Sequence, residues 1–239
     1  ISRHYKRPEG FAIEHGSESG LGDLSLLVNW TVFRTQPPPP VQSAKGAKNV
    51  VAPAEPDFST SLNVLAGLKF PTGSASRIKE EFNETEIEGA PESGIHGHDL
   101  ALGTGSWDGI FGVESFTRWK NLFFEAGMQY IVRGEGAYSY RYANELSWNG
   151  GPGVFLHREG GNLIGLQAAI SGHSKGKDTF QGETAEDTGM TSLYIGPRVL
   201  ASFGSFSADF GWEWPVVLHN TSLQSVPDWR LRASVTYHF

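Results

Sequence analysis

The chain of 239 residues contains no cysteine, which excludes disulfide bonds and thiolate metal sites and leaves the redox compartment open. It contains no run of 18 apolar residues, so a transmembrane helix is excluded. Positive charge is in deficit, with 19 Lys and Arg against 26 Asp and Glu and a net charge of -7, which argues against nucleic acid as a partner. The N-terminus, ISRHYKRPEG, lacks the apolar core of a signal peptide, so we expect any such peptide to have been removed.

Alternation of apolar and polar residues is what the sequence does contain, and the last eleven residues, 229–239, show it most clearly. One face of this segment is apolar and the other is polar or cationic, as a strand with a side-chain period of two requires. The length matches the ~9–11 residues of a membrane-spanning strand. A final strand that ends on an aromatic residue, here Phe239, resembles the signal read by the machinery that assembles bacterial outer-membrane β-barrels. An edge strand of a soluble β-sandwich is the alternative.

The same period-two pattern recurs upstream between clusters of Gly, Asn, Asp and Ser. It predicts about ten strands in all, of which one, near 10–16, is short and the segment 229–239 is the last. The others lie at 23–34, 57–70, 109–119, 121–133, 144–157, 162–173, 191–203 and 205–218. The mean hydropathy of -0.30 agrees with a barrel, because alternating strands do not register as hydrophobic segments.

The connections between these strands alternate in length. Short turns at 204–205, 158–161 and Lys120 alternate with long loops at 219–227, 174–189, 134–143 and 71–108. Short turns at one rim and long extracellular loops at the other are typical of outer-membrane barrels, whereas a soluble sandwich has no reason to sort its loops. We therefore predict an all-β chain that forms one antiparallel transmembrane β-barrel domain over 1–239, surrounded by the lipid of a bacterial outer membrane.

One connection, 35–56, departs from this pattern because it is long and proline-rich yet falls on the short-turn, periplasmic rim. Pro37–Pro40 cannot donate to a strand ladder and favour a stiff polyproline II segment. A solvated linker is one interpretation. A docking segment for a periplasmic partner protein, or a segment folded into the lumen, is the other.

Charged residues fall on the polar faces of the expected strands. A charge facing lipid near the membrane midplane would cost ~2–4 kcal/mol, so we expect these side chains to face the lumen. Both signs are interleaved, so most can pair across strands, and a packed polar core and a narrow conduction path both remain open. The predicted lumen residues are Asp23, Lys69, Glu114, Arg118, Glu125, Arg133, Glu145, His157, Arg198, Asp209, Glu213, Arg230 and Arg232.

Aromatic residues dominate the opposite, lipid-facing sides. Rings with an apolar body and one polar group suit the membrane interface. The expected interface residues are Trp30, Trp119, Trp148, Trp212, Trp214, Trp229, Tyr237 and Phe239.

The long loop 71–108 contains a candidate metal site, because His96, His98 and Asp99 could place two imidazoles and a carboxylate on one ion. No further ligand is fixed by the sequence, and we expect no cofactor. No nucleophile motif such as G-x-S-x-G is present, so we do not expect an enzyme.

Three short stretches, GLGDLS from Gly20, GLKFPTG at 67–73 and LGTGSWD at 102–108, occur in this order. Together they resemble a family of outer-membrane transporters named for the MetA pathway of phenol degradation, over about residues 20–239. The resemblance implies an outer-membrane barrel, passage of small aromatic or apolar molecules, and no catalytic residues. Members of that family have further strands before the first stretch, which implies twelve strands if an N-terminal hairpin is missing here.

Two functional hypotheses follow. The first is a narrow outer-membrane channel for small solutes, in which the lumen charges set selectivity and loops 71–108 and 174–189 gate the outer mouth. The second is a closed scaffold barrel that anchors partner proteins through 35–56. Bore depends on strand number, and about ten to twelve strands lie between filled ~8-stranded barrels and open ~16-stranded ones.

Overall fold

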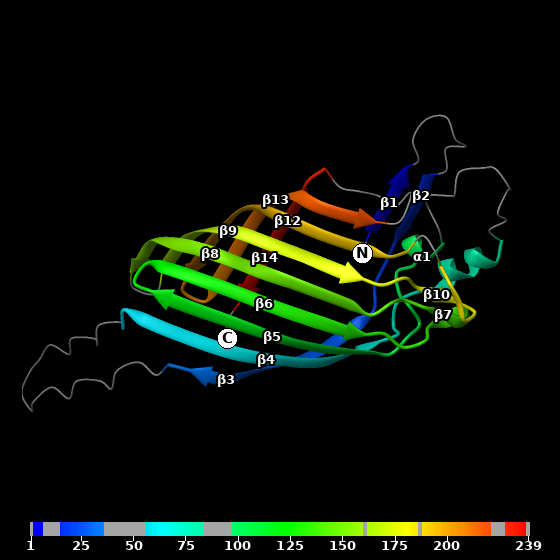
Figure 1. Cartoon of the computed structure of the whole chain (residues 1–239), viewed down its shortest axis with the longest axis horizontal. Helices are drawn as coiled ribbons and strands as arrows, with labels where there is room; N and C mark the ends of the chain where they lie inside the picture. The colour runs from blue at the N-terminus through cyan, green and yellow to red at the C-terminus, as the bar shows by residue number, and fades with distance from the viewer. Residues whose placement is uncertain are drawn as a thin grey trace, which may run out of the picture.

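Nine long strands build one antiparallel sheet in the computed structural model, which describes residues 2–6, 15–35, 56–83, 97–159, 162–185, 188–220 and 228–237. The strands neighbour one another in chain order, and Figure 1 shows the sheet curling until β13 and β14 pass behind β6 and β8. They are β3 (Leu24–Arg34), β4 (Phe58–Phe70), β5 (Asp108–Trp119), β6 (Leu122–Val132), β8 (Glu145–Glu159), β9 (Asn162–Lys175), β12 (Met190–Phe203), β13 (Phe206–Asn220) and β14 (Arg230–Tyr237). The predicted all-β, antiparallel barrel class is confirmed.

The two faces of the curled sheet differ in chemistry. Val64 and Val113 are paired on the outer face, while the next pair along the same two strands, Asn63 and Glu114, lies on the inner face. Large apolar side chains are exposed over the outer face, among them Leu26, Val28, Trp30, Leu68, Phe111, Phe124, Phe210, Trp212 and Leu231. The period-two pattern therefore reports the two faces of one sheet.

Connections are sorted by length between the two rims. On the short-turn rim, two-residue turns begin at Lys120 between β5 and β6 and at Gly204 between β12 and β13, with φ of 53° and 58°. Positive φ at such positions gives a hairpin the twist that its strands need, and glycine reaches it without a Cβ clash. The long loops meet at the other end, called the long-loop rim below.

The described parts of three long loops, 71–108, 134–143 and 174–189, pack on one another above the long-loop rim and form a small cap (Figure 1). Ile78, Ala101 and Tyr140 make its buried core, and Tyr140 Oη donates to Asp178 at 2.8 Å. The cap consists of η1 (Ser76–Asn83), α1 (Gly97–Leu100), η2 (Ala137–Ser139), β7 (Tyr140–Arg141), β10 (Thr179–Phe180) and β11 (Glu183–Thr184). The described parts of loops 71–108, 134–143 and 174–189, which we expected at one rim, therefore pack together in one layer.

The tenth strand expected near 10–16 does not extend the main sheet within the described residues. Residues 10–14 lie outside them, and β2 (His15–Ser19) pairs instead with β1 (Ser2–Lys6) in a separate hairpin. This hairpin is tied to the cap by an ion pair of 2.7 Å between Glu18 and Arg77.

The odd number of strands in the main sheet bears on whether the sheet can close into a barrel. Nine alternating strands leave the two edge strands, β3 and β14, running in the same direction. A ring in which every neighbour is antiparallel has an even number of strands, so the nine described strands form an arc with two edges. No helix among the described residues is long and apolar enough to cross a membrane.

Candidate solute pathway

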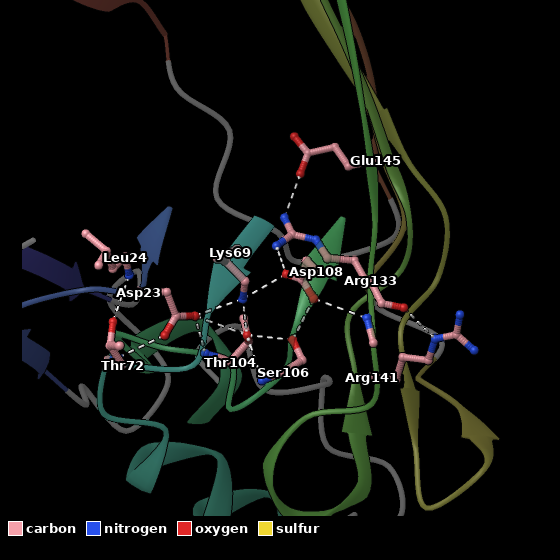
Figure 2. A network of polar contacts seen from close by, with 12 residues as sticks. Asp23, Leu24, Lys69, Thr72, Thr104, Ser106, Asp108, Arg133, Arg141 and Glu145 are labelled. Carbon is pink, nitrogen blue, oxygen red and sulfur yellow. Dashed lines mark hydrogen bonds and ion pairs between the residues drawn. The ribbon is translucent and has the colours of Figure 1, made fainter. Parts of the chain in front are cut away.

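The three short stretches that carry the family resemblance meet in one buried network at the long-loop rim (Figure 2). Lys69 Nζ lies 2.8 Å from Asp23 Oδ2 and 2.8 Å from Asp108 Oδ2, and it also contacts Thr104 Oγ1. Lys69 and Asp108 are 8% and 1% exposed. We call Asp23, Lys69, Thr104, Ser106 and Asp108 the clasp, because it ties the start of β3, the end of β4 and the loop before β5 together.

Backbone packing brings these stretches close enough for the contacts. Asp23 accepts the amides of Gly73 at 2.9 Å and Thr104 at 3.0 Å. A Cβ on Gly103 would lie 2.5 Å from the carbonyl oxygen of Gly73, so only glycine fits there. Burial alone would raise the pKa of Asp23, but the hydrogen bonds from Lys69 and the two amides outweigh it and lower the pKa below the ordinary value.

Asp108 carries the network on to β6 and β8. It accepts Arg133 at 2.8 Å, Ser106 Oγ at 2.8 Å and the amide of Gly134 at 3.1 Å. Arg133 in turn reaches Glu145 at 3.2 Å. These predicted lumen residues therefore hold one another through charge-assisted hydrogen bonds, and only Arg133 Nε is buried without a partner among the described residues.

A second network covers the inner face of β9, β12, β13 and β14. Arg198 pairs with Asp209 at 2.8 Å and Glu125 at 3.3 Å, and it donates to Gln167 at 3.2 Å. Arg230 pairs with Glu213 at 2.6 Å, and its guanidinium stacks 3.7 Å from the ring centre of Tyr194.

The remaining predicted charges on the inner face differ in their partners. Arg118 donates to the carbonyls of Lys120 at 3.1 Å and Pro56 at 2.9 Å, near the short-turn rim. Glu114 and Arg232 take part in no ion pair within the described part of the chain. Arg232 lines a small cavity together with Asn149, Ser171, Arg198, Asp209 and Glu213.

His157 is the one predicted lumen residue that the structure places differently. A β-bulge between Phe155 and His157 inserts an extra residue, so His157 lies opposite the outer-facing Ile164, and Arg158 takes the inner position. Simple alternation gives the wrong face here because a bulge shifts the phase by one.

The inner face also carries a row of stacked aromatic rings that the sequence did not predict. Phe116 and Phe123 stack with ring centres 5.9 Å apart, and Phe123 and Phe155 with centres 4.6 Å apart. Phe123 lies over Gly153, where a Cβ would come within 2.1 Å of the ring. The alternation could have indicated them, because each of these three phenylalanines falls at a position that the period of two assigns to the polar face of its strand.

The predicted interface aromatics lie on the outer side of the strands, with Trp212 and Trp214 stacked at 5.4 Å and Trp229 6.0 Å from Trp212. Trp30 and Trp148 share the outer face with Val64 and Met128, and Phe239 lies outside the described residues. Trp30, Trp119, Trp212, Trp214, Trp229 and Tyr237 are all exposed.

For the candidate metal site, His96 lies outside the described residues, as does most of the proline-rich connection. His98 is buried and stacks on Tyr140 with centres 5.3 Å apart. No group of three ligating side chains occurs among the residues that the structure describes. Ser192 Oγ and His173 Nδ1 lie 3.1 Å apart on the inner face, but Ser192 is fully buried and offers no accessible nucleophile.

The arrangement of the strands has a counterpart in a solved structure. The chain superposes on the crystal structure of an outer membrane channel from Pseudomonas putida F1 with a TM-score of 0.57, over 93% of this chain and 69% of that chain. The two sequences are 13% identical, so the likeness concerns the fold. No family model and no curated protein matches the sequence. The fold is that of outer-membrane β-barrels, while the MetA name rests on the short stretches alone.

Proposed function

We propose that this chain forms the wall of an outer-membrane channel that passes small solutes down their gradients. The observation that carries the proposal is the opposed chemistry of the two sheet faces. An exposed apolar outer face of this extent has no place in water and suits lipid. Behind it lies an inner face of hydrogen-bonding and charged side chains, which suits a hydrated interior.

Two further features support this function. The solved structure with the same fold is described as an outer membrane channel. The inner charges are mostly neutralised in pairs, so a solute meets a polar wall without a strong field of one sign. Kinship with the MetA-pathway transporters, and with it passage of aromatic or apolar molecules, belongs to the same proposal and rests on the three clasp stretches.

Planar-bilayer recording of the purified, folded protein tests the function. A channel gives conductance steps of defined size that scale with salt concentration. A folded protein that gives no steps at any voltage would contradict the proposal and favour the closed scaffold barrel.

A further inference from the structure

Glu114 stands apart from the other charges along its own strand. The inner face of β5 reads Asp108, Ile110, Gly112, Glu114, Phe116 and Arg118. Asp108 is locked in the clasp at one end, and Arg118 donates to two carbonyls at the other. Glu114 lies midway, is exposed, and takes part in no ion pair within the described residues. At ~3.4 Å per residue it is about 20 Å from Asp108 along the strand, so the clasp does not neutralise it.

The surroundings of Glu114 are amides and glycines. Asn63 lies directly opposite on β4, and Asn29 Nδ2 donates to Glu114 Oε2 at 3.4 Å. On the other side, β6 presents Gly127, and on β5 itself Gly112 comes two residues earlier on the same face. Asn149 reaches over Gly127, where a Cβ would lie 2.9 Å from its Oδ1, so a further amide borders the carboxylate on that side.

A phenyl ring is the nearest inner-face neighbour on the other side along β5. Phe116 follows Glu114 by two residues, so both side chains leave the same face about 7 Å apart. The ring stacks against Phe123, which fixes its orientation. A carboxylate beside an aromatic face, with amide oxygens within reach, is the chemistry that recognises organic cations.

We propose that Glu114 and Phe116 form a binding site for small organic cations, such as quaternary ammonium ions, within the interior. The carboxylate supplies the negative charge. The phenyl face adds a cation–π attraction, which is weaker for a metal ion that keeps its hydration shell. The site rests on the proposed channel function, because solutes reach it through the interior.

The test is bilayer recording in a potassium chloride gradient, with tetramethylammonium added as the probe. The wild type is expected to prefer potassium over chloride, and tetramethylammonium is expected to reduce the potassium current. In E114Q the cation preference falls and block weakens about tenfold, since one uncompensated charge is removed. In F116L the potassium preference stays while block weakens about threefold, since only the ring face is lost. E159Q, which removes an exposed carboxylate at the short-turn end of β8, serves as the charge-matched control and keeps the wild-type values.

Unchanged ion preference in E114Q, or a wild type without cation preference, would overturn the site while leaving the channel intact. A folded but silent wild type would instead overturn the channel function. Calorimetric titration of the detergent-solubilised protein with tetramethylammonium then decides the site independently. Binding that is lost in E114Q supports it, and equal heats in both proteins overturn it.

Discussion

The clasp and the middle of the inner face both contain carboxylates, but those in the clasp are buried and paired whereas Glu114 is exposed and forms no ion pair among the described residues. In the clasp, the Lys69 ammonium lies between two carboxylates, and Asp108 is 1% exposed. Around Glu114, a carboxylate of the same chemistry is exposed and has one long hydrogen bond from Asn29. A buried charge requires partners, whereas an exposed one remains available to a solute.

Charged side chains on the inner wall therefore fall into two groups, those bound in ion pairs and those without one. Arg198 and Arg230 are each bound to carboxylates, so replacing them disturbs the wall itself. Glu114 and Arg232 form no ion pair in the described chain, so replacing them should disturb the wall less. If the chain acts as the proposed channel, we expect these two charges, rather than the paired ones, to set its ion preference.

Replacing Lys69 by Met should have the largest effect. It leaves Asp23 and Asp108 facing each other as buried carboxylates without their shared cation, and removing one partner of a buried pair costs about 3–5 kcal/mol. We expect a correspondingly lower free energy of unfolding by urea in detergent. K79M, at an exposed position of η1, is the matched control and should change little. Equal losses in both variants would show that the clasp contributes nothing special.

Adding a methyl group at Gly103 should have the next largest effect. The new Cβ of G103A would lie 2.5 Å from the Gly73 oxygen and 2.7 Å from Asp23 Oδ1, and overpacking of this kind typically costs about 1–3 kcal/mol. Unfolding by urea measures the loss. G176A is the control, because a Cβ there meets its nearest neighbour, the Ala143 methyl, at 3.6 Å. A G103A protein as stable as G176A would show that the loop backbone shifts without penalty.

Strand positions were predictable because one face is apolar and the other polar along most of each strand. Each end of the nine strands in the main sheet lies within two residues of the expected one, and the rim at which each loop falls follows from counting strands. Alternation failed at His157, where a bulge changed the phase. No sequence pattern marks a bulge of this kind, because it depends on how β8 fits the neighbouring strand.

The charged set was predictable as a face, but its pairing was not. Alternation places Arg198 and Glu114 equally on the inner side, yet one is paired and the other is not. Pairing depends on register between strands distant in sequence, as in the contact of Arg198 with Glu125, 73 residues away. The clasp shows the same limit, since its three stretches were recognisable as motifs while their convergence required the fold.

Arg230 and Arg232 offer a smaller, sharper test within one strand. R230M removes the partner of Glu213, which is 3% exposed, and should lower the free energy of unfolding by about 1–3 kcal/mol. R232M, two residues further on the same face, should leave stability within about 0.5 kcal/mol of the wild type. It should instead shift the reversal potential toward cation preference. Destabilisation of equal size in both variants would contradict the division between paired and uncompensated charges.

The smallest expected effect is the loss of the stabilising contribution of Asp23 to the clasp at acid pH. The pKa of Asp23 is lowered in the folded state, so its contribution to stability is complete above the ordinary aspartate value of about 4 and is lost as pH falls through the lower, folded value. The stability difference between wild type and D23N should therefore be constant from pH 7 to about pH 5 and shrink below about pH 4. Urea unfolding at a series of pH values measures it. If the difference instead grew as pH fell from 7 to 5, Asp23 would have a raised pKa, and burial rather than the Lys69 ammonium would dominate the clasp.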